Sequence, residues 1–251
     1  MITIIKHILK KILPDYFVGR LVRLKRKYID DYAVKSYSEF GEDVILRNLF
    51  ENQKSGFYVD VGAYHPKFLS NTYYFYKKGW RGINIDATPQ SMRLFRKLRP
   101  RDINVEAAIS SEKRTLKFFM FDGDFKFFNT FSEELAEKVG YKDVIEIQTT
   151  TLEEILDKYM PAGQEIDILS VDVEGLDYEV LLSNNWEKYR PKVIVVEILD
   201  LLKKEGISIE DVLKNKIYKF LKEKNYEFFA KTPCNAIFVD KDFLEARFSK
   251  I

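Results

Sequence analysis

The chain of 251 residues contains a single cysteine, Cys234, so it cannot form an internal disulfide. A lone thiol is typical of proteins that fold in a reducing compartment, and we therefore expect a cytoplasmic location. No apolar run reaches the roughly 18 residues that a membrane-spanning helix needs. The N-terminus is basic and amphipathic and has no small-residue cleavage site, so it is a poor match to a signal peptide.

Glycine-rich phosphate-binding loops are also missing. After Gly62 the sequence continues Ala63-Tyr64-His65-Pro66, without the second and third glycines of a dinucleotide-binding turn. Such a turn needs those glycines so that the backbone can approach a pyrophosphate, and their absence argues against NAD. No Gly-x-x-x-x-Gly-Lys-Ser/Thr sequence is present either, which excludes a P-loop.

Basic residues are concentrated at one end of the chain. Residues 1–27 carry eight lysines and arginines against one acid, a net charge of +7, whereas the remainder carries 33 basic and 38 acidic residues, or −5. Isoleucines and leucines recur at helical spacing over residues 4–13, and a second apolar stripe runs through Phe17, Leu21, Leu24 and Tyr28. One interpretation is a helical hairpin packed on the body of the protein. The other is an arm that lies on an anionic membrane surface, at the inner face of the membrane.

Residues 36–251 alternate short apolar runs with amphipathic segments. Residues 57–61, 82–87 and 103–109 are predicted strands, separated by helices that we expect to begin at Ser70 and at Thr88-Pro89. Further strands are predicted at 144–150, 166–173, 192–198, 226–230 and 236–239, with a long helix capped by Ser208. Strands alternating with helices predict parallel βαβ units, so we expect one α/β domain after a helical extension at residues 1–35.

A phenylalanine-rich segment interrupts this alternation. Seven phenylalanines fall within residues 115–131, around the turn-forming pair Asp122-Gly123. The turn predicts a hairpin inserted into the α/β pattern. The aromatic side chains are expected to fill core space, and the second hypothesis is that they form the pocket of an acceptor substrate.

Acidic residues recur where the predicted strands end. They are Asp60, Asp86, Glu106, Asp172 with Glu174, and Glu197. Ligands of open parallel sheets bind at the carboxyl ends of the strands, and an acid after the second strand is placed to hold the hydroxyls of a ribose. Asp86 follows Gly62 by 24 residues, near the usual spacing of about twenty. The sequence therefore predicts a ligand with a ribose and an adenine-like ring but no phosphates in the first turn.

Several ordered segments are similar to one known family. They are YVDVGAYHP (58–66), SNT (70–72), GWRGINIDATP (79–89), INVEAAIS (103–110) and DILSVDVEGLDYEVL (167–181). Together they resemble the FkbM family of S-adenosylmethionine-dependent methyltransferases, over roughly residues 36–240. The resemblance implies a Rossmann-like, mostly parallel seven-stranded sheet whose last strand is antiparallel. Tyr64 and Pro66 depart from the glycines that are commoner in the methyltransferase loop.

The resemblance also implies roles for individual residues. Asp60, Gly62 and Ala63 would contact the methionyl and ribose side of the cofactor, Asp86 and Ala87 the ribose, and Glu106 and Ala107 the adenine. Asp172 and Glu174 would lie beside the sulfonium and the acceptor. His65 is the first candidate for the base that takes the acceptor's proton, because its ordinary pKa suits that task near neutral pH, and Asp172 is the second. Structural roles compete with these: Gly62 as a tight turn, and Asp86, Asp172 and Glu174 as helix caps.

The function implied is O-methylation of a sugar, glycan or secondary-metabolite hydroxyl, for example in polysaccharide biosynthesis. No nucleic-acid partner is expected. The alternatives are a non-catalytic module that binds an adenosine ligand, and a peripheral membrane adaptor built on the same fold. Asp172, Glu174 and Glu197 are hard oxygen ligands that suit a divalent metal, but the same acids can bind acceptor hydroxyls directly, and a metal is not the favoured hypothesis.

Overall fold

The computed structural model describes residues 15–29, 33–123, 129–198 and 207–248. The chain divides into two units, Met1–Lys35 and Ser36–Ile251. In the first unit, helix α2 (Asp15–Tyr28) contains the second apolar stripe that the sequence predicts. The helix predicted at residues 4–13 lies outside the described residues. No helix within the described ranges is both long and apolar enough to cross a membrane.

Seven strands of the second unit form one sheet in the order β3-β2-β1-β7-β8-β10-β9. Their bounds are β1 (Phe57–Val61), β2 (Arg81–Asp86), β3 (Ile103–Glu106), β7 (Ile168–Val171), β8 (Val193–Glu197), β9 (Tyr226–Lys231) and β10 (Asn235–Asp240). Neighbouring strands are parallel except where β10 pairs with β8 and β9, both antiparallel. This confirms the predicted mostly parallel seven-stranded sheet with an antiparallel last strand.

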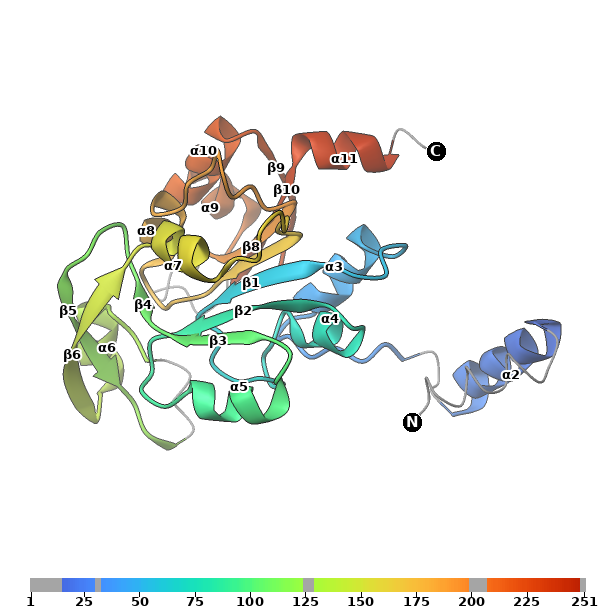
Figure 1. The fold of residues 1–251 in the computed structure, drawn as a ribbon, viewed down its shortest axis with the longest axis horizontal. Coiled ribbons are helices and arrows are strands. Elements are labelled where there is room, and N and C mark those ends of the chain that lie inside the picture. The colour runs from blue at the N-terminus through green and yellow to red at the C-terminus, as the bar shows by residue number, and fades with distance from the viewer. Residues whose placement is uncertain (1–14, 30–32, 124–128, 199–206, 249–251) are drawn as a thin grey trace. The chain divides into compact units, whose positions relative to one another are not determined.

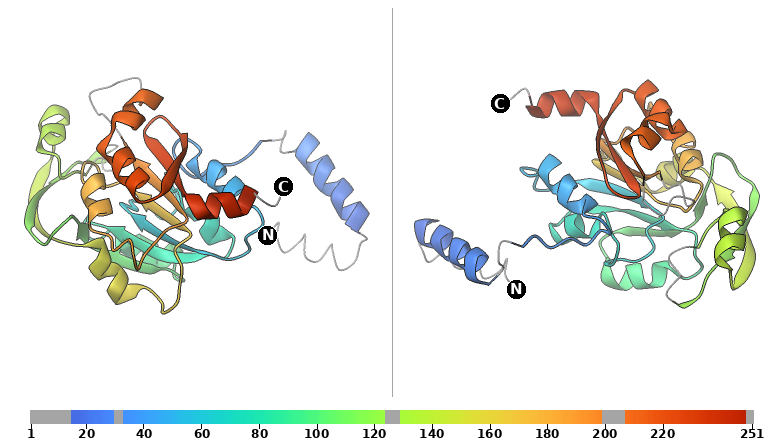
Figure 2. Two further views of the ribbon diagram at one scale, coloured as in Figure 1. Left: turned by 90° about the horizontal axis from the view of Figure 1, so that it is seen from above. Right: turned by 180° about the vertical axis from the view of Figure 1, so that it is seen from behind.

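Helices cover both faces of this sheet, because the buried strands alternate apolar side chains between them. In β1, Val59 and Val61 belong to one core and Tyr58 to the other. The first core is completed by α7 (Leu152–Tyr159), α8 (Asp177–Leu182), α9 (Ile209–Lys214) and α10 (Lys216–Glu223). The second is completed by α3 (Glu42–Leu49), α4 (Tyr73–Lys77) and α11 (Lys241–Phe248). Helix α5 (Met92–Leu98) packs on Ala63, and Figures 1 and 2 show the sheet between these layers.

A small second sheet lies beside the main one, with strands in the order β4-β6-β5 (Figure 1). It contains β4 (Ala108–Ile109), β5 (Thr115–Met120) and β6 (Asp143–Thr150), and α6 (Glu133–Val139) lies in the connection from β5 to β6. The strand predicted at 103–109 is therefore two strands, one in each sheet. The turn predicted at Asp122-Gly123 leads into residues outside the described part of the chain. Within the described residues, β5 pairs with β6, and one antiparallel bridge, Phe119 to Thr130, joins β5 to the segment after the turn.

Three helix boundaries differ from the prediction. The helix expected from Thr88-Pro89 begins at Met92, because the Thr88 N–H bonds to Asp86 and Gln90 takes a left-handed φ of 67°. The helix expected from Ser70 begins at Tyr73, although the Ser70 hydroxyl does accept a bond from the Tyr73 N–H. The long helix after Ser208 is broken at Asn215, whose extended backbone ends α9 and whose side chain caps α10.

Candidate functional site

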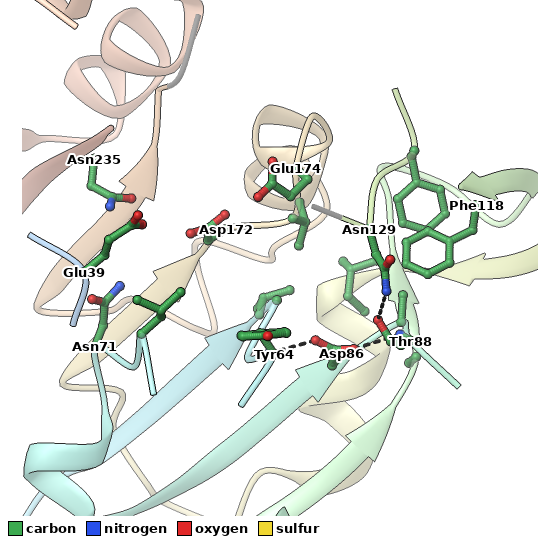
Figure 3. A pocket seen from close by; sticks show the side chains of 18 of the residues that line it. Glu39, Tyr64, Asn71, Asp86, Thr88, Phe118, Asn129, Asp172, Glu174 and Asn235 are labelled. Carbon is green, nitrogen blue, oxygen red and sulfur yellow. Dashed lines mark hydrogen bonds between the residues drawn. The ribbon is translucent and has the colours of Figure 1, made fainter. Parts of the chain in front are cut away.

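A pocket opens at the carboxyl ends of β1, β2 and β7, and about 900 Å³ of space free of protein atoms lies within it and its mouth. Its lining residues come from both sheets and from the loops between them (Figure 3): Glu39, Glu42, Val61, Gly62, Tyr64, Leu69, Asn71, Asp86, Ala87, Thr88, Ala107, Ile109, Phe118, Asn129, Phe131, Asp172, Val173, Glu174 and Asn235. The carboxyl edge of a parallel sheet is the expected place for a ligand.

Gly62 forms the floor of the pocket, where the turns after β1 and β7 meet. It has a φ of +81°, a left-handed conformation that glycine adopts without strain. A Cβ atom placed there would lie 1.6 Å from the carbonyl oxygen of Asp172. Two backbone segments can approach this closely only because no side chain intervenes, so Gly62 sets the spacing of the two turns.

Asp86 stands at the end of β2 with both carboxylate oxygens held by the backbone. One accepts from the N–H of Tyr64 and the other from the N–H of Thr88, each at 2.8 Å (Figure 3). Burial raises the pKa of Asp86, and the bonds from Thr88 and Tyr64 oppose that shift. The hydroxyls of Thr88 and Ser91 also oppose the rise in the pKa of Asp86, so a ligand hydroxyl would share this carboxylate with them.

The wall beside Asp86 is apolar and aromatic. Ala87, Ala107 and Ile109 line it together with Phe118 and Phe131, whose ring centroids lie 4.7 Å apart. Two members of the phenylalanine-rich segment therefore lie in the pocket. Phe119 and Phe121 are instead buried against α6.

The opposite wall is acidic, and its carboxylates come from segments distant in the sequence. Burial, and then repulsion from Asp177, raise the pKa of Asp172 to about 8. Burial and the charge of Asp172 raise the pKa of Glu174. Glu174 adopts a left-handed φ of 54°, and its buried Oε2 has no hydrogen-bond partner among the described residues. A strained residue that aims an unpartnered oxygen at a pocket is the pattern of a functional side chain.

Five of the predicted site residues do not line the pocket, and one of them is Glu197, a possible metal ligand. Asp60 is buried beneath it and accepts a 2.6 Å bond from the Thr72 hydroxyl. Ala63 packs on α5, and Glu106 is exposed and accepts from the N–H of Gln90. His65 accepts from the N–H groups of Lys67 and Phe68 through Nδ1, at 3.1 and 2.9 Å. The catalytic role of His65 stays a prediction, and the structure does not bring it together with Asp172.

Several lining residues were not predicted as site residues, because nothing in their local sequence marks them. Glu39 and Glu42 precede and begin α3, and Glu42 is fully buried with bonds from the Thr232 hydroxyl at 2.5 Å and the Asn235 amide at 3.0 Å. Asn129 follows the phenylalanine-rich segment and donates to the Thr88 hydroxyl. In the sequence Glu42 is an ordinary acid in the first turn of a helix, so its place in the pocket is visible only in the fold.

Comparison with known families matches residues 60–228 to the methyltransferase FkbM domain, which is more than half of the chain. The chain belongs to the FkbM methyltransferase family. Among solved structures, a TehB-like SAM-dependent methyltransferase from Corynebacterium glutamicum is similar at 12% identity, over 90% of this chain and 97% of that chain, with a TM-score of 0.37. That similarity is too low to add to the family assignment. The search of curated proteins gave no match.

S-adenosylmethionine is the cofactor of this methyltransferase family, and the residues of the FkbM pocket fit it. Asp86 would hold the ribose hydroxyls at the carboxyl end of β2, and Ala87, Ala107 and Ile109 would contact the adenine. When ionised, the carboxylate of Glu174, whose Oε2 has no hydrogen-bond partner among the described residues, would attract the positive sulfonium of this cofactor. The FkbM domain thus transfers methyl groups.

Proposed function

We propose that this methyltransferase acts on a hydroxyl group of a sugar, a glycan or another polyhydroxylated acceptor. The observation that carries the proposal is the composition of the pocket wall facing Asp86. It presents acids and amides, which hydrogen-bond hydroxyl groups well, and among the residues lining it none is lysine or arginine. The side chains concerned are those of Glu39, Asn71, Asp172, Glu174 and Asn235 (Figure 3).

The aromatic pair supports the same class of acceptor. Phe118 and Phe131 offer an apolar surface at the edge of a pocket whose other wall is polar. A sugar has hydroxyls around its rim and C–H groups on its faces, so it matches a site with one polar and one aromatic side. An acceptor that was apolar throughout would leave the acidic wall without partners, which is costly.

The catalytic task of the chain is to orient the acceptor hydroxyl and to take its proton. When bound, S-adenosylmethionine supplies an electrophilic methyl group. We assign proton acceptance to Asp172 or Glu174, because burial raises the pKa of both carboxylates toward the range of a base that works near neutral pH. His65, the base first suggested by the sequence, is held by backbone N–H groups outside the lining of the pocket.

Binding of S-adenosylhomocysteine tests the cofactor half of the site. In Asp86→Ala, loss of a charged hydrogen-bond partner should weaken binding by about 1.5–3 kcal/mol, roughly ten- to a hundredfold, in calorimetry. Asp157→Ala is the matched control, because that acid is exposed on α7 and pairs with Lys188 and Tyr189. Unchanged affinity in Asp86→Ala would show that the ribose is held elsewhere.

Transfer of a labelled methyl group tests the acceptor half. Free sugars, nucleotide sugars and lipid-linked glycans are incubated with the enzyme, and the product is treated with base. A methyl ether survives that treatment and a methyl ester does not, so base-stable label on a hydroxyl supports the proposal. Asp172→Asn should lower turnover by about 10²-fold or more while it still binds S-adenosylhomocysteine. Label found only on nitrogen or as an ester would contradict methylation of a hydroxyl group.

A further inference from the structure

Three carboxylates meet at the edge of the pocket where β7 and β8 end. They belong to Asp172, which follows β7, to Asp177 in the first turn of α8, and to Glu197, the last residue of β8. One oxygen from each lies within 4.8 Å of the other two. Parallel neighbouring strands bring their carboxyl ends to one edge, so the sheet itself holds two of the three acids together.

Positive charge does not balance this cluster. Within the described ranges, no lysine, arginine or histidine forms an ion pair with Asp172, Asp177 or Glu197. Asp177 and Glu197 are 7% and 8% exposed, so water screens them poorly. Like charges held this closely away from water must be neutralised by protons or by a bound cation.

Asp177 is fixed in position by the loop before it. Its carboxylate accepts from the N–H of Val173 at 3.1 Å and from the N–H of Gly175 at 3.2 Å. Hydrogen bonds of this kind, from backbone groups that do not touch the ion, orient a carboxylate ligand and leave its other lone pairs available. The sequence suggested Glu174 as the partner of Asp172 and Glu197, whereas the structure groups Asp177 with them.

An independent observation comes from the next strand. Asn235 is 5% exposed and lies directly opposite Glu197 in the pairing of β10 with β8. Its Nδ2 donates to Glu42 at 3.0 Å, which defines the orientation of the amide, and its Oδ1 has no hydrogen-bond partner among the described residues. Figure 3 shows this side chain turned toward Asp172. A buried amide oxygen without a donor needs a ligand, and amide oxygens bind hard cations.

We propose that Asp172, Asp177, Glu197 and the Oδ1 of Asn235 form a binding site for a divalent, oxygen-preferring cation. Oxygens that bind one Ca²⁺ at about 2.4 Å lie at most about 4.8 Å apart, and the three carboxylate oxygens are within that limit. Mg²⁺, with bonds of about 2.1 Å, limits the separation of its ligand oxygens to about 4.2 Å and usually keeps water in part of its shell.

The cation would act on the acceptor, and this part of the inference depends on the proposed function. Asp172 belongs both to the cation cluster and to the wall that is proposed to hold the acceptor hydroxyl. A divalent ion there binds the hydroxyl oxygen and lowers its pKa, which eases loss of the proton. Binding of the cation itself needs neither the acceptor nor the cofactor.

Direct binding to the full-length protein tests the site. After treatment with EDTA and removal of the chelator, the protein is titrated with Mn²⁺ by electron paramagnetic resonance and with Mg²⁺ and Ca²⁺ by calorimetry. We expect one ion per chain, together with a rise in melting temperature. Glu197→Gln and Asp177→Asn should each weaken binding at least tenfold, whereas Glu187→Gln, at an exposed acid outside the cluster, should bind as the wild type does.

Two further measurements separate a metal site from a structural cluster. Glu197→Gln removes one of the crowded carboxylates, so the metal-free variant should melt at or above the wild-type temperature but should no longer respond to the ion. Equal, saturable binding of the ion by Glu197→Gln, Asp177→Asn and Glu187→Gln would overturn the proposal. Absence of binding for every ion up to about 10 mM, a concentration beyond the range of weak protein sites, would overturn it too. Cation binding is measured without acceptor or cofactor, whereas the proposed function is tested by base-stable label on a hydroxyl, so the failure of either one is told apart from the failure of the other.

Discussion

Arg99 donates a 2.8 Å hydrogen bond from Nη1 to the hydroxyl of Thr72, and neither side chain is exposed to solvent. The same hydroxyl donates at 2.6 Å to Asp60, at the end of β1. Arg99 also donates to the hydroxyl of Ser70 at 2.7 Å and to the carbonyl of Pro66 at 2.8 Å. A single guanidinium therefore fixes the whole loop that leads from β1 to α4 and passes the pocket.

Removal of this guanidinium should destabilise the fold. We expect Arg99→Met to lower the free energy of unfolding by about 3–5 kcal/mol, because it leaves Asp60 and Asp102 buried without their cation. Arg101→Met is the control, since that arginine is exposed and donates only to a carbonyl in α4, and its loss should cost less than about 1 kcal/mol. Denaturant unfolding of both variants checks the difference, and equal costs would show that the network is not structural.

The strands that are buried along their whole length were predictable from the sequence. Every residue of β1 and of β8 is buried. Apart from Asp60 and Glu197 both runs are apolar, and a short apolar run bounded by turns predicts a strand buried on both faces. The start of α5 was not predictable, because the Asp86 carboxylate holds the N–H of Thr88 and keeps Thr88 and Pro89 in a turn. The hydrogen bond from Thr88 to Asp86, a residue of the pocket, thus overrides the preference of Thr88 for capping a helix.

Some residues of the candidate site were likewise predictable from the sequence, and others were not. Gly62 and Asp86 follow strands directly, so their place at the carboxyl edge of the sheet follows from the strand assignment. Glu39 and Asn235 reach the same pocket from opposite ends of the chain. No spacing rule connects residues almost 200 positions apart, so only the folded chain could bring them together.

The close approach at Gly62 can be tested against a second glycine. Gly62→Ala should lower the free energy of unfolding by about 3–5 kcal/mol, because a left-handed alanine is strained and its Cβ would meet the Asp172 carbonyl. Gly79 has a similar φ of +100°, but no atom lies within 4 Å of the place that a Cβ would occupy there. Gly79→Ala should therefore cost only about 1–2 kcal/mol in thermal or denaturant unfolding. Similar costs at both positions would mean that the turns after β1 and β7 can separate freely.

His65 should titrate below its ordinary range. Burial, followed by the positive charges of Arg99 and Lys67, lowers the pKa of His65 from 6.5. The chain has two histidines, so imidazole signals in an NMR titration can be assigned with a single His7→Gln variant. A midpoint for His65 at or above 6.5 would contradict the packing of this loop.

The same residue predicts how stability depends on pH. Because its pKa is lowered on folding, the stability contributed by neutral His65 is complete above about pH 6.5 and is lost as the pH falls through the pKa of the folded state. Protonation of Nδ1 would also break its two backbone hydrogen bonds. His65→Asn retains an acceptor, so the difference in melting temperature between wild type and variant should shrink from pH 8 to pH 5. A constant difference would assign the acid sensitivity to other groups.

Helix α2 provides the last test, since its surface combines apolar and basic side chains. Leu21, Leu24 and Tyr28 are 47%, 44% and 70% exposed, and Arg20, Arg23 and Lys27 are exposed among them. A helix of this kind binds anionic lipid by burying its apolar side chains while its basic groups contact phosphates. We propose that residues 1–27 attach the enzyme to the anionic inner face of a membrane, where a lipid-linked acceptor would be held.

Co-sedimentation with vesicles of anionic and of neutral lipid checks this proposal. Replacing Arg20, Arg23 and Lys27 by glutamine removes three charges worth about 1 kcal/mol each near such a surface, so binding to anionic vesicles should fall by about a hundredfold. The matched control replaces three exposed lysines of the second unit, Lys113, Lys117 and Lys214, and should bind as the wild type does. Equal pelleting of both triple variants would remove the membrane role. A helix needed only for attachment contributes nothing to the stability of the methyltransferase domain. If deletion of residues 1–27 lowered the melting temperature of the remaining chain and left lipid binding unchanged, the extension would therefore pack on the domain and would not attach it to a membrane.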